Sequence, residues 1–210
     1  MLPRLLPMLA VPTAPFDSPE YSFEVKWNGI RALAAVETDG WRLWGRERAD
    51  YTARYPELDV LRGLPAATLV DGELVTFDAD GRADLPRLLR RHGLTDPWRV
   101  RQARHWCRVR YVVFDLLYHS GRCLVREPLA RRRDVLAEVC QRLDAEDVRF
   151  SAGVIGAGSA CYEAAVAQGH EGVMAKHLAS TYRPGRRSAA WRKIKPRPKK
   201  SHSAREIASY

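Results

Sequence analysis

Alternating apolar and polar residues recur along the chain and predict β-strands. Phe23, Val25 and Trp27 alternate with charged residues, which is the period of a half-buried strand. The Asn28-Gly29 step that follows them predicts a hairpin turn. Further strands are expected at residues 31–36, 41–44, 68–77, 111–118, 172–177 and 191–195.

Three short stretches depart from this alternation. The Asp71-Gly72 step is typical of a turn and is expected to break the strand at residues 68–77. The first sixteen residues hold four prolines and are expected to form an extended leader. Residues 196–210 are polar and rich in proline and lysine, which predicts a linker or a disordered tail.

Helical spacing of apolar residues appears mainly in the second half of the chain. It is strongest at residues 128–143, which begin with a proline suited to a first helical turn. A second helix is expected from Ser159, as its N-cap, to Gln168, with Gly169 as its stop. Shorter helices are expected at residues 55–64, 85–91 and 98–104. Because strands and helices intermix without a β-α-β rhythm, the pattern favours an α+β fold with largely antiparallel sheets.

The composition of the 210 residues narrows the class of protein. Hydrophobic residues make up 46% of the chain, which is enough for a core. No apolar run approaches the roughly 18 residues of a spanning helix, and prolines interrupt any signal-peptide core, so no membrane association is expected. The four cysteines form no C-x-x-C pair and share no ligand spacing with histidines. We therefore expect reduced thiols rather than a zinc site or a disulfide framework.

The charge is concentrated in two basic runs. The formal net charge is +10, and residues 172–204 hold ten basic residues and no acidic one. Residues 87–110 hold eight arginines and one aspartate. A single charge run is most often a solvated surface, but two in a chain of this length favour a phosphate-rich partner.

The widespread nucleotide and hydrolase motifs do not account for this charge. The phosphate-binding P-loop pattern is absent, as are G-x-S-x-G and H-E-x-x-H. Gly156 and Gly158 supply half of a dinucleotide fingerprint, which fits a loop entering a helix better.

Five other segments together carry the chemistry of phosphoryl or nucleotidyl transfer. Each has an ordinary interpretation alone, as a surface lysine, a turn or core residues. The segments are EVKWNGIR at 24–31, DGE at 71–73, FD at 114–115, EGVMAK at 171–176 and WRKIK at 191–195. A lysine beside a tight turn is held rigidly, and its amine is a nucleophile when neutral, which neighbouring cations favour.

The other residue types in these segments complete such a site. Glu73 and Glu171 supply the oxygen ligands that Mg²⁺ prefers. Lys193 and Lys195 stand two residues apart, so they project from the same face of a strand and can grip one phosphate. An aromatic ring and a methionine can sandwich a purine. The set therefore indicates phosphoryl or nucleotidyl transfer.

In this order, the segments resemble the signature of covalent nucleotidyltransferases: ATP-dependent DNA ligases, RNA ligases and mRNA capping enzymes. That family opens with K-x-D-G-x-R and closes with K-x-K, which here read KWNGIR at 26–31 and KIK at 193–195. The chain looks most similar to the adenylation domain of bacterial ATP-dependent DNA ligases, including the ligase part of non-homologous end-joining enzymes. The resemblance implies the covalent nucleotidyltransferase (ATP-grasp-like) fold: α+β, two antiparallel sheets flanked by helices, with the nucleotide in the groove between them.

The resemblance also implies a mechanism and a role for each site residue. Lys26 would attack ATP in the presence of Mg²⁺ or Mn²⁺, hold AMP covalently and pass it to a DNA 5′-phosphate. The remaining roles are as follows: Glu24 contacts adenine N6, Arg31 and Glu73 fix the ribose, Phe114 and Met174 sandwich the adenine, Lys176, Lys193 and Lys195 face the phosphates, Glu73 and Glu171 support the metal, and Arg46 engages the 5′-phosphate end.

The implied partner is duplex DNA with nicks or ends, in a cytoplasmic, nucleoid-associated enzyme of DNA repair, recombination or replication. Residues 1–196 would form the adenylyltransferase domain and residues 197–210 a basic linker or tail. The OB-fold domain of complete ligases is expected to be absent, so an OB-fold domain in trans or a Ku-like end-binding protein would assist.

Asn28, where the family usually has aspartate, leaves two alternatives open. The first is a ligase-like module that binds nucleotide or DNA without completing the reaction. The second is the same chemistry on RNA, or a GTP-using capping reaction.

Overall fold

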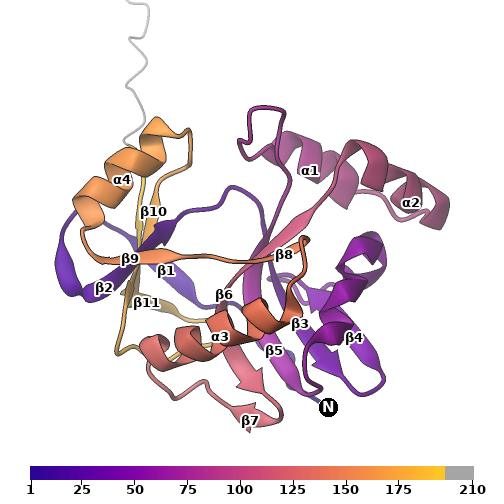
Figure 1. Cartoon of the computed structure of the whole chain (residues 1–210), viewed down its shortest axis with the longest axis horizontal. Helices are drawn as coiled ribbons and strands as arrows, with labels where there is room; N and C mark the ends of the chain where they lie inside the picture. The colour runs from indigo at the N-terminus through magenta and orange to yellow at the C-terminus, as the bar shows by residue number, and fades with distance from the viewer. Residues whose placement is uncertain (197–210) are drawn as a thin grey trace, which may run out of the picture.

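Two β-sheets face each other in the computed structural model, which describes residues 1–196 (Figure 1). The linker or tail predicted at residues 197–210 lies outside the described residues. One sheet has five strands in the order β1-β11-β10-β2-β9. Their bounds are β1 Leu9–Pro12, β2 Ser18–Val25, β9 Gly153–Gly156, β10 Val173–His177 and β11 Arg187–Ile194.

The second sheet has six strands, in the order β4-β3-β5-β6-β7 with β8 paired to β6. Their bounds are β3 Ile30–Glu37, β4 Gly40–Trp44, β5 Thr68–Val75, β6 Arg110–His119, β7 Arg122–Cys123 and β8 Val148–Phe150. Most pairs are antiparallel, as predicted. The β1–β11 and β6–β8 pairs are parallel, so both sheets are mixed.

Helices flank both sheets, which agrees with the predicted α+β class. They are α1 Leu85–His92, α2 Pro97–Trp106, α3 Leu129–Leu143 and α4 Gly158–Ala167, with 3₁₀ helices η1 Thr52–Arg54 and η2 Pro56–Gly63. Helix α3 packs on β6 and β8, and α4 packs on β2 and β10. No helix in residues 1–196 has both the length and the apolarity to cross a bilayer.

The alternation along β3 divides the core between the two faces of its sheet. Ala32 and Ala34 join the cluster that η2, α1 and α3 cover. Leu33 and Ala35 point the other way, into a cluster that also holds Trp191 of the five-stranded sheet and Tyr182 from the loop between β10 and β11. A third cluster fixes α4 on the five-stranded sheet. The period-2 pattern therefore builds the interface between the sheets.

The predicted hairpin at Asn28-Gly29 is wrong. Strand β2 pairs with β9 and β10, whereas β3 pairs with β4 and β5, so residues 26–29 cross from one sheet to the other. A side chain at Gly29 would collide with the carbonyl of Leu74 on β5. The glycine is needed because the crossing segment passes directly against that strand.

The predicted break at Asp71-Gly72 is also wrong. Strand β5 runs through both residues, and only its register with β6 shifts between them. Asp71 is fully buried and holds Arg31. A buried charged partner thus overrides the turn preference of the local sequence.

Further differences concern the ends of elements. The predicted extended leader contains β1, which pairs with β11. The loop expected around Gly156 is the edge strand β9, whose exposed Val154 and Ile155 give no alternating signal. Helix α4 begins at Gly158, and the backbone N–H of Ser159 donates to Asp17 Oδ1 at 2.8 Å, so the capping side chain comes from Asp17 rather than Ser159.

The pair Arg132–Asp115 ties α3 to the centre of the six-stranded sheet. Both side chains are fully buried, and the guanidinium donates to both carboxylate oxygens at 2.7 and 2.8 Å. Arg132 also donates to the carbonyls of Glu127 and Ser180. The guanidinium of Arg132 therefore has its ionic and hydrogen-bond partners only when α3 is packed on β6.

We expect Asp115→Ala to lower the free energy of unfolding by about 3–5 kcal/mol, because it leaves a buried guanidinium without its counter-charge. Urea unfolding measures this change. The matched control is Asp80→Ala, which removes an exposed pair with Arg82 and should change stability by no more than about 1 kcal/mol. Similar losses for the two variants would contradict the prediction.

Candidate active site

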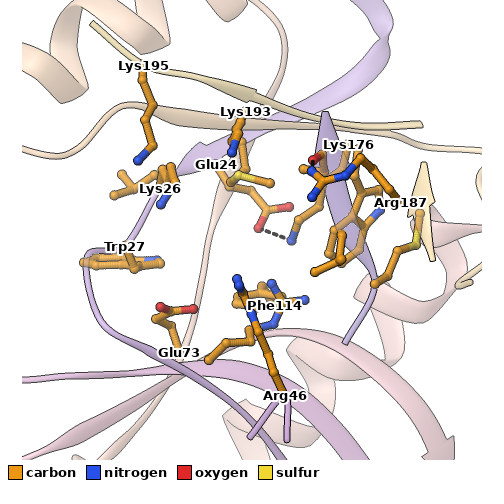
Figure 2. A pocket seen from close by; sticks show the side chains of 17 residues that line it. Glu24, Lys26, Trp27, Arg46, Glu73, Phe114, Lys176, Arg187, Lys193 and Lys195 are labelled. Atoms are coloured by element: carbon orange, nitrogen blue, oxygen red, sulfur yellow. Dashed lines mark hydrogen bonds and ion pairs between the residues drawn. The ribbon is translucent and has the colours of Figure 1, made fainter. Parts of the chain in front are cut away.

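A cavity of about 260 Å³ lies between the two sheets and is lined by residues of both. Figure 2 shows lysines on one wall, with Glu73, Phe114 and Arg46 on the other. The lining residues are Met8, Leu9, Ala10, Glu24, Val25, Lys26, Trp27, Arg31, Arg46, Glu73, Phe114, Met174, Lys176, Arg187, Trp191, Lys193 and Lys195. The cavity brings together every site residue predicted from the sequence except Glu171, which contacts two of the lining lysines.

The backbone of Lys26 is fixed where the chain leaves the five-stranded sheet. Its N–H donates to the carbonyl of Gly172 at 2.9 Å, just beyond the last residue of β2. Gly172 has a φ of +133°, and a side chain there would collide with the Ile194 carbonyl. Glycine is therefore required at the position that anchors Lys26.

Glu171 bridges two lysines of the cavity. Its two carboxylate oxygens pair with the ammonium groups of Lys26 and Lys195. Burial alone would raise the pKa of Glu171, but hydrogen bonds and attraction from both lysines outweigh it and lower the pKa. Glu171 therefore holds both lysine side chains in place at the cavity.

Arg31 is clamped between the sheets. Its Nε and Nη2 atoms donate to the two oxygens of Asp71, each at 2.6 Å, and its guanidinium lies 4.4 Å from the Phe114 ring centroid. Tyr182 donates to Asp71 at 2.6 Å and accepts the Met8 N–H at 2.9 Å. Burial works to lower the pKa of Arg31, but Asp71 reverses this and raises it. The sequence did not identify the contributions of Asp71 and Tyr182.

Glu24 and Lys176 pair with each other in the cavity wall. Lys176 Nζ lies 2.8 Å from Glu24 Oε2, and Arg133 of α3 lies 2.7 Å from Oε1. The Lys176 ammonium also sits 4.1 Å from the Phe114 ring centroid and 4.6 Å from that of Trp191. Burial lowers the pKa of Lys176 to about 8. The sequence did not identify the role of Arg133, and it placed Trp191 in the segment at 191–195 without assigning it a role.

Glu73 lies opposite Arg31 in the β3–β5 register. Burial raises the pKa of its carboxyl to about 7, against the attraction of Arg31 and Lys26. No group of three or more His, Cys, Asp or Glu side chains in residues 1–196 is placed to hold a metal ion. Mg²⁺ takes one or two carboxylates and completes its shell with water and substrate phosphates, so the carboxylate oxygens of Glu73 or Glu171 are ligands of the kind it prefers.

This lysine-centred cavity between two sheets is the arrangement of a nucleotidyltransferase domain. The family described as "ATP dependent DNA ligase domain" matches residues 7–195. The chain therefore belongs to the family of ATP-dependent DNA ligase adenylation domains.

Named relatives agree with this assignment. The DNA ligase of Methanothrix thermoacetophila is 36% identical over 182 residues, covering 82% of this chain and 32% of the relative. The multifunctional non-homologous end joining DNA repair protein LigD of Mycobacterium tuberculosis is 33% identical over 196 residues, covering 91% of this chain and 24% of the relative. The chain thus spans a quarter to a third of the length of these relatives.

A solved structure shows the same fold. The mycobacterial DNA ligase D complexed with ATP and MES has a TM-score of 0.76 and 30% identity to this chain. The match covers 91% of this chain and 60% of that structure.

The raised pKa of Glu73 makes stability depend on pH. The folded carboxyl keeps its proton up to about pH 7, whereas the unfolded one loses it near 4.5, so stability falls as pH rises between these values. Glu73→Gln removes this fall. We expect the variant to gain stability relative to the parent, by up to about 3 kcal/mol more at pH 8 than at pH 4.5. Thermal unfolding across this range measures the difference, and a difference that does not change with pH would contradict the prediction.

Proposed function

We propose that Lys26 forms a covalent lysyl-AMP and that this chain transfers AMP to a DNA 5′-phosphate. The observation that carries the proposal is the placement of Lys26, whose backbone is fixed in the cavity wall among further cations. Its neutral amine would attack the α-phosphorus of ATP. A P–N bond would form, the α–β P–O bond would break, and pyrophosphate would leave.

Basic residues on the five-stranded sheet would receive the phosphates. Lys193 on β11 and Lys195 just beyond it line the same cavity as Lys26. Their charges would stabilise the negative charge that builds on the phosphorus oxygens. As the polyanion enters, Glu171 would release Lys26 and Lys195 and bind the metal instead. A bound Mg²⁺ or Mn²⁺, held by Glu73 and Glu171, would polarise the phosphoryl oxygens.

The nucleoside would occupy the part of the cavity between Phe114 and Met174, which both line it. Glu24 would contact adenine N6, while Arg31 and Glu73 would hold the ribose. Because Asp71 already engages the Nε and Nη2 atoms of Arg31, this arginine enters the reaction with its orientation set. Lys176 would act near the phosphates only as part of its pair with Glu24.

The later steps would use duplex DNA with nicks or ends. Arg46 is exposed and lines the cavity, so it would engage the 5′-phosphate end. AMP would pass to that phosphate, and a 3′-hydroxyl would then displace it and seal the strand. Residues 1–196 would act as the adenylyltransferase unit, with help from an OB-fold domain or from a Ku-like protein at double-strand ends.

A second function is a binding module that holds nucleotide or DNA without sealing it. Asn28 favours this alternative, because it replaces a carboxylate in the crossing segment directly after Lys26. Asparagine keeps the hydrogen-bonding capacity but loses the negative charge.

Covalent labelling tests the proposal. The protein is mixed with α-labelled ATP and Mg²⁺ or Mn²⁺ and separated on a denaturing gel. We expect an acid-labile label on the parent protein and none on Lys26→Ala. Lys26→Arg is the matched control, because it keeps a charge beside Glu171 but supplies no nucleophilic amine, and it should also remain unlabelled.

Nicked DNA should discharge the label, and nicked RNA should compete poorly for it. Labelling of a folded Lys26→Ala variant would overturn the proposal. An unlabelled parent that still binds nicked DNA would favour the binding module.

A further inference from the structure

The basic run at residues 87–110 is not part of the cavity between the sheets. It forms α1, α2 and the short turn between them, which Figure 1 shows together at the upper right, beside the six-stranded sheet. Leu88, Val100 and Ala103 are buried and fix the pair to the core. We define the exposed side of α2, from Trp98 to Trp106, as the basic arm.

The basic arm presents cations with no partner inside the protein. Arg99, Arg101 and Arg104 are exposed, and none forms an ion pair within residues 1–196. By contrast, nearby Arg108 and Arg110 pair with Glu146. The arm therefore keeps charges that are available to a partner.

Folding does not explain this arrangement. Arg99 lies in the first turn of α2, at the positive end of the helix dipole, where a cation is unfavourable. Trp98 stays 62% exposed, and Trp106 39%. Arg99 thus weakens the isolated helix, and the two tryptophans leave apolar surface in water, so all three side chains are accessible to another molecule.

A hollow lies between the C-terminal end of α2 and the segment that follows β5. Its lining residues are Thr76, Phe77, Asp78, Ala79, Gly81, Arg87, His105, Trp106, Arg108 and Arg110. Phe77 meets Trp27 edge to face with ring centroids 6.2 Å apart, and Trp27 lines the cavity. The Arg110 guanidinium lies 5.5 Å from the Phe77 ring centroid. The contact between Trp27 and Phe77 therefore places the hollow, and with it the C-terminal end of α2, beside the cavity.

From this geometry we infer that the basic arm binds the phosphate backbone of the duplex that flanks the reacting nick. This inference rests on the proposed function. A ten-residue helix is about 15 Å long, which matches about four base pairs of duplex. The exposed arginines of this helix can neutralise phosphates of the duplex without reading base sequence.

The salt dependence of binding tests the inference. In the full chain, Arg99→Ala, Arg101→Ala and Arg104→Ala are combined, and affinity for a fluorescent nicked duplex is measured by anisotropy at several salt concentrations. Because each lost phosphate contact reduces the slope of log K against log salt by about 0.9, we expect the slope to become shallower by about 2 to 3. The matched control combines Arg126→Ala, Arg131→Ala and Arg142→Ala, exposed residues on and beside α3. It removes the same charge and should shift the slope by less than one.

Shortening the duplex one flank at a time locates the contact. For the parent, trimming one particular flank should weaken binding and flatten the salt slope, and trimming the other should have a smaller effect. For the arm variant, trimming the first flank should weaken binding only slightly further, because the contacts between the arm and that flank are already lost. Equal effects of trimming on the parent and the arm variant would overturn the inference, as would equal slopes for the arm and control variants.

Two further measurements separate this inference from neighbouring explanations. Trp98→Ala should leave duplex affinity within twofold. If single-stranded DNA instead competes as well as duplex, and Trp98→Ala abolishes that competition, the arm is a stacking platform and the inference is overturned.

Labelling of Lys26 with ATP in the absence of DNA should be unchanged in the arm variant. An unlabelled parent would count against the proposed reaction, while the anisotropy data would still decide the role of the arm.

Discussion

The structure depends on a buried positive charge between its two sheets. Arg31 projects from the six-stranded sheet and reaches the Phe114 and Trp191 rings, so the guanidinium lies in the interface itself. A charge taken from water needs a partner, and Asp71 supplies a bidentate one from the adjacent strand. Tyr182 completes the shell from the loop after β10. The sheets are therefore held in one relative arrangement by a directional contact and not by apolar packing alone.

The need to pair each charge with a counter-charge also governs the cavity between the sheets. Its wall holds several cations close together, which repel one another unless anions are nearby. Glu24 neutralises Lys176, and Glu171 neutralises Lys26 and Lys195. These two carboxylates differ in exposure, because Glu24 is almost fully buried and Glu171 is 29% exposed. An incoming polyphosphate would compete with the accessible carboxylate and leave the buried pair intact, so Glu171 is the one positioned to release its lysines.

The sequence predicted the parts of the site that lie in contiguous segments. Lys26, Lys193 and Lys195 lie in short segments whose order along the chain resembles a family signature, so the sequence alone was sufficient to propose them. The contacts that orient the site join residues far apart in the chain: Tyr182 and Asp71 are separated by 111 positions. Local preference also misassigned residues 71–72 as a turn, because their conformation is set by burial of the Arg31 partner. Similarly, Asn28-Gly29 has hairpin chemistry, but the flanking strands find better partners in different sheets.

The division of residues between the two sheets constrains how any ligand is held. The lysines belong to the five-stranded sheet and its crossing segment, whereas Phe114, Glu73 and Arg46 come from the six-stranded sheet and the loop after β4. A ligand with an apolar base and a polyanionic tail is the kind of molecule that satisfies both walls at once. The segment that carries Lys26 is also the covalent link between the sheets. A bond formed at its amine would therefore fix the ligand at the junction of the two sheets, where a small change in their separation alters contacts on both walls.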